Sequence, residues 1–145
     1  MGNEVLEFAN KIGATDLKEI FEGTEYRSLF KRRNYFMLKD DIFLVIKISR
    51  NNIRPFWGFG EKFFDLFNKL TRNKGNYYFV ALESDKSGWV FSKKEILDSI
   101  SDRSLSYSVS QKQYKINNYN LRHHKKFTSV RSFLDLIGVQ DETAS

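Results

Sequence analysis

The sequence has no cysteine, so disulfide bonds and thiolate metal sites are excluded, and a reducing compartment fits. It also lacks a long apolar run, because none approaches the ~20 residues that a membrane-spanning helix needs. Near the N-terminus, Glu4 and Glu7 stand where a signal peptide would carry positive charge and then an apolar core. We therefore expect a soluble, cytoplasmic protein without a membrane partner.

Catalytic and cofactor motifs are missing as well. No Ser/His/Asp or Cys/His arrangement can be defended from the sequence, and Gly58 and Gly60 do not form a GxGxxG or P-loop pattern. His123 and His124 are the only histidines, and no third ligand lies near them along the chain. We expect no cofactor, no metal site and no catalytic residue.

Carboxylates are absent from one long stretch. Residues 103–134 contain seven basic residues and no acid, and residues 26–60 carry eight basic residues against Asp40 and Asp41. The whole chain has a net charge of +6. Two basic blocks that meet in the folded chain would form a surface for a polyanion. The alternative is that these residues only solvate the surface.

What is present is typical of a folded domain. The chain has 145 residues, of which 41% are hydrophobic and 16% aromatic, and it is too apolar to be disordered. A chain of this length can bury most of the surface that it exposes when unfolded. We assign residues 1–138 to a single α+β domain and expect residues 139–145 to form a flexible C-terminal tail.

Hydrophobic periodicity predicts helices alternating with pairs of strands. Ser92 and Glu95 match a capping box, which marks the start of one helix. This order favours an α+β fold with a mainly antiparallel sheet, curled or closed to a half-barrel, with helices packed around it. The predicted helices are 3–13, 15–23, 60–71, 92–101 and 128–138; the predicted strands are 35–39, 42–48, 77–82, 89–91, 105–109 and 114–116; and residues 49–58 and 117–127 are predicted loops.

The strand at 42–48 is the predicted centre of the sheet. Every residue in it is apolar except Lys47, which is the pattern of a strand buried on both faces. We expect Leu44 and Ile46 to share one core with Phe67 and Phe133. Because burial of a lone lysine is unfavourable, Lys47 either reaches water at the end of the strand or belongs to a functional site.

A lysine late in a strand, within a helix–hairpin–helix–strand order, resembles part of the core of PD-(D/E)XK nucleases. In that family an acid two residues before the lysine helps to hold a metal that activates water. Here that position is Val45, and Asp40 and Asp41 lie at the predicted turn. The resemblance implies a metal-dependent nuclease with a degraded motif, so we expect no metal-dependent cleavage and keep this activity as the second hypothesis.

Residues 55–60 combine aromatic residues with glycines, beside Arg50 and Arg54. This segment has two interpretations. Phe56 and Trp57 anchor a loop in the core, or the aromatic residues, Trp57 among them, form an exposed platform flanked by arginines, on which unpaired bases stack.

The sequence favours a non-catalytic nucleic-acid-binding domain, with DNA favoured over RNA as the ligand. A module that binds an acidic protein surface is a further alternative. Both would use the two basic blocks. The candidate nucleic-acid-binding residues are Lys31, Arg32, Arg33, Lys47, Arg50, Arg54, Trp57, Lys115, Arg122, His123, His124, Lys125 and Lys126.

Overall fold

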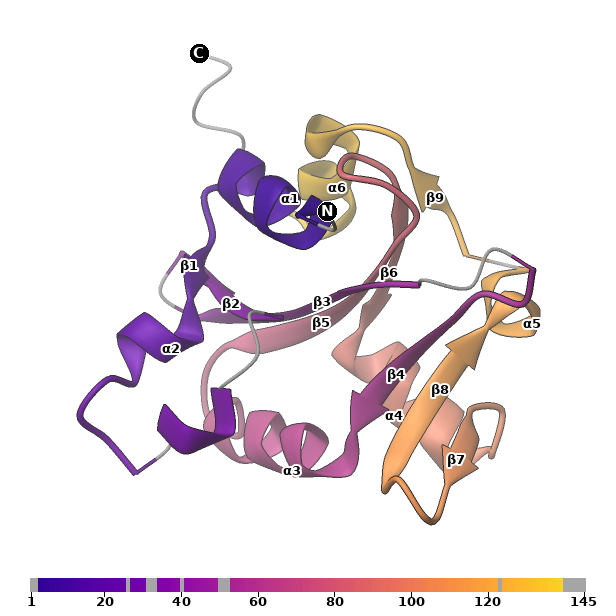
Figure 1. Ribbon diagram of the computed structural model, residues 1–145, viewed down its shortest axis with the longest axis horizontal. Helices are drawn as coiled ribbons and strands as arrows, with labels where there is room; N and C mark the ends of the chain where they lie inside the picture. Colours follow the sequence, from indigo (N-terminus) through magenta and orange to yellow (C-terminus); the bar gives the residue numbers. More distant parts are fainter. Residues whose placement is uncertain are drawn as a thin grey trace.

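The computed structural model describes residues 3–25, 27–30, 34–39, 41–49, 53–122 and 124–139. The fold is α+β, as predicted, with helices on both sides of a central sheet (Figure 1). The predicted tail 139–145 lies outside these residues except for Val139. Among the described residues, none of the helices combines the length and apolar character that crossing a membrane requires.

In the described part of the chain the main sheet has six strands, and the strand predicted at 42–48 is one of its two central strands. Neighbouring strands run antiparallel except for the β3–β5 pair, which is parallel and which the sequence did not predict. In sheet order the strands are β1 (Thr15–Asp16), β2 (Tyr35–Leu38), β3 (Ile42–Ile48), β5 (Asn76–Leu82), β6 (Gly88–Ser92) and β9 (Lys126–Phe127).

A second, three-stranded sheet lies across one face of the main sheet (Figure 1). It contains β4 (Phe56–Gly60), β8 (Gln113–Asn117) and β7 (Ser106–Ser108), all antiparallel. The prediction of a loop over 49–58 is therefore wrong at its C-terminal end. Trp57 and Phe59 are buried while Phe56 is exposed, so β4 does alternate between its two faces. The two glycines in β4 hide that alternation in the sequence.

The helices divide between the two faces of the main sheet (Figure 1). Capping signals set several of their ends: the Ser92–Glu95 capping box is present as predicted, and Gly13 ends the first helix with a left-handed φ of 76°. On one face lie α1 (Glu4–Ile12) and α6 (Val130–Leu136), and on the other lie α3 (Glu61–Leu70) and α4 (Lys93–Ser101). The shorter helices are α2 (Leu17–Ile20), the 3-10 turn η1 (Arg27–Phe30) and α5 (Asn118–Leu121).

The buried side chains form two clusters, so the prediction of one shared core is wrong. Leu44 and Ile46 face α1 and α6 and pack with Phe133, whereas Phe43 and Val45 face the opposite way and pack with Phe67. Alternate residues of a strand point to opposite faces, and a central strand with helices on both sides must therefore contribute to two cores. The apolar residues on both faces of β3 already indicated two cores.

Candidate nucleic-acid interface

Each basic block of the sequence contributes to the second sheet, although the strand from the first block contains no basic residue itself. Strand β4 comes from the first block and β8 from the second, and the two pair directly, with Gly58 opposite Lys115 and Phe56 opposite Asn117. Because adjacent strands lie ~5 Å apart, side chains on one face of this pair are in contact range. The β4–β8 pair therefore joins two segments that are far apart along the chain.

The outward face of this pair carries Phe56 and Lys115. Phe56 is 43% exposed, and the Lys115 ammonium lies over its ring, with Nζ 5.1 Å from the ring centroid. On the inward face, Phe59 and Ile116 are buried in the core. Alternation along both strands thus separates a core face from a face that pairs an aromatic ring with a cation.

Trp57 lies on the core side, which rejects the exposed-platform interpretation of this residue. It is 3% exposed, its indole N–H donates to the Leu82 carbonyl oxygen (3.1 Å), and its ring meets the edge of Trp89. A buried indole with a satisfied N–H is a structural residue. The exposed aromatic residue of β4 is its neighbour Phe56.

Helix α5 continues directly from β8 and presents a second aromatic ring with a cation. Asn117 and Asn120 form a capping box that starts this turn, and buried Leu121 anchors it. Tyr119 is 65% exposed, and the Arg122 guanidinium carbon lies 5.1 Å from the centroid of its ring. The predicted loop over 117–127 is therefore wrong here, because it contains a short helix that places Tyr119 and Arg122.

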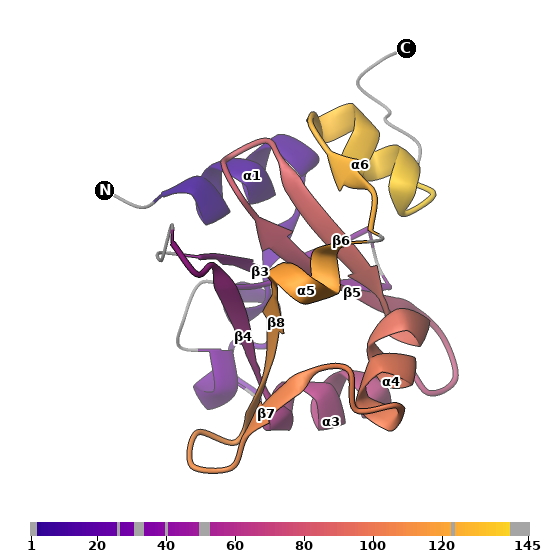
Figure 2. The same ribbon diagram turned by 90° about the vertical axis from the view of Figure 1, so that its right-hand side faces the viewer.

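We call the exposed surface formed by Phe56, Lys115, Tyr119 and Arg122 the basic–aromatic face. Figure 2 shows β4, β8 and α5, the elements that carry it, on the side turned toward the viewer. Arg54 is exposed two residues before Phe56, and the Phe56 backbone N–H donates to Ser49 Oγ (3.1 Å), which fixes the start of β4. Among the described residues, neither Lys115 nor Arg122 forms an ion pair with a carboxylate.

Lys47 and Lys126 lie at opposite ends of one row across the main sheet. The register pairs Lys47 with Ala81, Ala81 with Trp89, and Trp89 with Lys126. Lys47 is half-buried, with Nζ 5.9 Å from the Phe59 centroid. This row lies on the same side of the main sheet as β4 and β8, since Phe59 and Trp89 belong to the same cluster.

Lys126 is neutralised within the protein. Its ammonium lies 2.7 Å from Glu83 Oε1 and 5.2 Å from the centroid of Trp89. The stretch 103–134 contains no acid, but a carboxylate 43 positions earlier along the chain reaches Lys126. Lys126 holds β9 against β6 instead of presenting an unpaired charge.

His124 and Lys125 do not join the basic–aromatic face. His124 Nε2 lies 2.6 Å from Glu95 Oε2, and its ring packs on Phe91, so it ties the segment to the start of α4. Lys125 lines a cavity of about 180 Å³ with Tyr78 and Leu136, which belong to the α6 side of the sheet. Arg122, His124 and Lys126 thus have different surroundings.

Five candidates from the sequence lie outside the residues that the structure describes: Lys31, Arg32, Arg33, Arg50 and His123.

The end of the second sheet far from the basic–aromatic face carries carboxylates. There the Tyr107 hydroxyl donates to Glu61 Oε2 (3.2 Å). Burial, followed by the Glu61 charge, raises the pKa of Tyr107, and burial followed by the charges of Glu61 and Asp65 raises the pKa of Tyr114. The second sheet is therefore polarised, with carboxylates at one end and the basic–aromatic face at the other.

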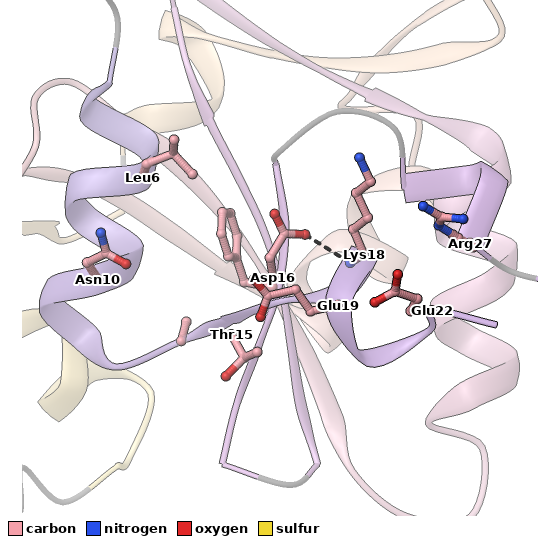
Figure 3. Close-up of a pocket in the computed structure, with 10 residues that line it drawn as sticks. Leu6, Asn10, Thr15, Asp16, Lys18, Glu19, Glu22 and Arg27 are labelled. Carbon is pink, nitrogen blue, oxygen red and sulfur yellow. Dashed lines mark hydrogen bonds between the residues drawn. The ribbon is translucent and has the colours of Figure 1, made fainter. Parts of the chain in front are cut away.

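A separate hollow of about 490 Å³ lies between α1 and α2, beside β1. Figure 3 shows the carboxylates of Asp16, Glu19 and Glu22 with Lys18 and Arg27 around it. The volume suits a small molecule. Three carboxylates against two cations do not favour a polyanion, so we place the nucleic-acid interface elsewhere.

The structure keeps Asp41 away from Lys47, the residue that matches the PD-(D/E)XK pattern. Asp41 precedes β3 and Lys47 lies near its far end, six residues or ~20 Å away along the strand. In the described part of the chain, no group of three or more His, Cys, Asp or Glu side chains is placed to hold a metal ion.

Comparisons with protein-family models, with curated proteins and with solved structures gave no match to this chain. Its function is therefore inferred from the site itself. Tyr119 was not predicted from the sequence, and the interpretation that Phe56 anchors a loop in the core is wrong, because Phe56 is exposed. For Phe56 the usable signal was the period of two in β4, which places neighbouring aromatic residues on opposite faces.

Proposed function

We propose that this protein is a non-catalytic nucleic-acid-binding domain, with DNA as the preferred ligand, and that it binds through the basic–aromatic face. The observation that supports this most strongly is the pair of cations held over exposed rings: Lys115 over Phe56 and Arg122 over Tyr119. The cytoplasmic location expected from the composition forms part of the same proposal.

The chemistry of each cation–ring pair suits a nucleotide. A cation over a ring keeps its full charge, because the ring attracts it without neutralising it. That charge remains available to a phosphate, while the exposed part of the ring can contact a sugar or a base. Lys126, which Glu83 neutralises, is left out of the proposed phosphate-binding set.

An acidic protein surface is the rival ligand, since it would meet the same cations. Exposed aromatic rings favour nucleic acid over a carboxylate-rich surface, because bases offer a flat π-face to every ring. Polyglutamate serves as the probe for the rival ligand, since it carries the charge of an acidic surface without bases.

The test measures binding of a fluorescently labelled DNA oligonucleotide of about 20 nucleotides by anisotropy at ~50 mM salt. The double variant Lys115→Ala/Arg122→Ala is compared with Lys69→Ala/Lys74→Ala, which removes the same charge from exposed positions at the end of α3 and in the turn that follows. We expect the first variant to bind roughly tenfold more weakly for each phosphate that it no longer neutralises, from counterion release. The control should bind like the parent.

Two results would overturn the proposal. The first is that the parent protein fails to bind DNA at this salt concentration. The second is that the Lys115/Arg122 variant binds as tightly as the parent while its melting temperature is unchanged. Displacement of DNA by an equal charge concentration of polyglutamate would favour the acidic protein surface instead. An RNA strand of the same length tests the preference for DNA.

A further inference from the structure

The rings of the basic–aromatic face are exposed although the fold has cores on both sides of the main sheet. Tyr119 is 65% exposed and Phe56 43%, and Ile53, three residues before Phe56, is 88% exposed. A single exposed apolar residue is ordinary, but a group of them on neighbouring segments marks an interaction site. Cations lie over the rings of Phe56 and Tyr119, so the site suits an anion that also carries flat apolar groups.

We propose that the basic–aromatic face binds unpaired nucleotides, with bases stacked on Phe56 and Tyr119 and phosphates held by Lys115 and Arg122. This inference rests on the proposed function and adds the strandedness of the ligand. In a duplex, neighbouring base pairs cover the faces of each base, so the rings cannot stack on them. In a single strand those faces are available, and stacking on aromatic side chains supplies affinity without sequence preference.

The spacing of the two rings suits nucleotides a few positions apart on one strand. Phe56 is paired across the ladder with Asn117, and Tyr119 follows Asn117 by two residues within the first turn of α5. A cross-strand step of ~5 Å and two helical residues place the two backbones within roughly 10 Å of each other. At the ~3.4 Å rise of a stacked strand, that interval spans about three nucleotides.

The experiment compares dT12 with a duplex of the same length, using Phe56→Ala, Tyr119→Ala and the control Tyr107→Ala. Tyr107 is also an exposed tyrosine of this sheet region, 40% exposed, but it lies at the far end beside Glu61. We expect each of the first two variants to weaken dT12 binding by about fivefold to 150-fold, the effect of removing one stacked base. Duplex binding should change less than about twofold, and Tyr107→Ala should match the parent with both ligands.

Conservative variants separate stacking from folding. Phe56→Tyr and Tyr119→Phe keep a ring and should bind dT12 within about threefold of the parent, because either ring offers a face to a base. Melting temperatures report on the fold of every variant.

The outcomes distinguish this inference from the proposed function. If the parent binds neither dT12 nor duplex, both are wrong. If the parent binds DNA but prefers the duplex, or if the two alanine variants weaken both ligands equally, the single-strand inference is wrong while nucleic-acid binding stands.

Discussion

Phe56 and Trp57 are adjacent in one strand and have different roles. The indole of Trp57 is buried against Trp89 and donates to the Leu82 carbonyl, whereas the ring of Phe56 lies outside beneath the Lys115 ammonium. The sequence left two interpretations of this aromatic segment, burial in the core or an exposed stacking platform, and each holds for one of the two residues: Trp57 is buried and Phe56 is exposed. Position in the strand decides this, since a residue that faces the core is inaccessible to a ligand however large its ring.

Tyr77 yields a prediction at the residue scale. Burial raises the pKa of its phenol to about 12, against the lowering effect of its hydrogen bond to Asn68 Oδ1. In the unfolded chain this phenol has a pKa of about 10. The unfolded state therefore loses its proton first, and the protein loses stability as the pH rises from about 10 to about 12, by at most about 3 kcal/mol from this group.

The Tyr77→Phe variant isolates that effect. At neutral pH it should be less stable than the parent by about 1 kcal/mol, because it cannot form the hydrogen bond to Asn68. Between about pH 10 and 12 the difference should shrink and then reverse, since the variant has no phenol to ionise at this position. Urea denaturation at several pH values measures this. A difference in unfolding free energy that stays constant up to about pH 12 would contradict the assignment.

At the scale of the element, α4 is held by its N-terminal capping box. Ser92 Oγ accepts from the Glu95 backbone N–H (3.1 Å), and Glu95 Oε1 accepts from the Ser92 backbone N–H (3.0 Å). Ser92→Ala should lower the free energy of unfolding by about 1 kcal/mol. The matched control is Ser101→Ala in the last turn of the same helix, where the serine is exposed. Equal stability of the two variants in urea would show that this cap contributes nothing.

Local signals in the sequence were enough to predict most elements. The capping box before α4 and the glycine after α1 mark helix ends through contacts within a few residues, so no knowledge of the fold is needed. The parallel pairing of β3 with β5 could not be predicted in this way, because it depends on the chain passing through β4 and α3 before it returns to the sheet. Strand β4 was missed because two of its outward positions are glycines.

At the scale of the whole molecule, the sequence predicted two basic blocks but not how they are used. Their junction depends on the non-local pairing of β4 with β8. Two further contacts join distant positions: Glu83 neutralises Lys126, and Glu95 contacts His124. A count of charges along the chain cannot reveal these contacts. The proposed interface is smaller than the two blocks and includes aromatic residues that a charge map ignores.

The salt dependence of binding tests the central claim most directly, because it counts the phosphates that the protein neutralises. If about five phosphates are engaged, log K should fall against log salt with a slope of about −3.5 for dT12 and about −4.5 for duplex DNA. Lys115→Ala/Arg122→Ala should flatten the dT12 slope by about 1.4, and Lys69→Ala/Lys74→Ala should leave it unchanged. A parent slope near zero, or an equal slope in both double variants, would contradict binding through the basic–aromatic face.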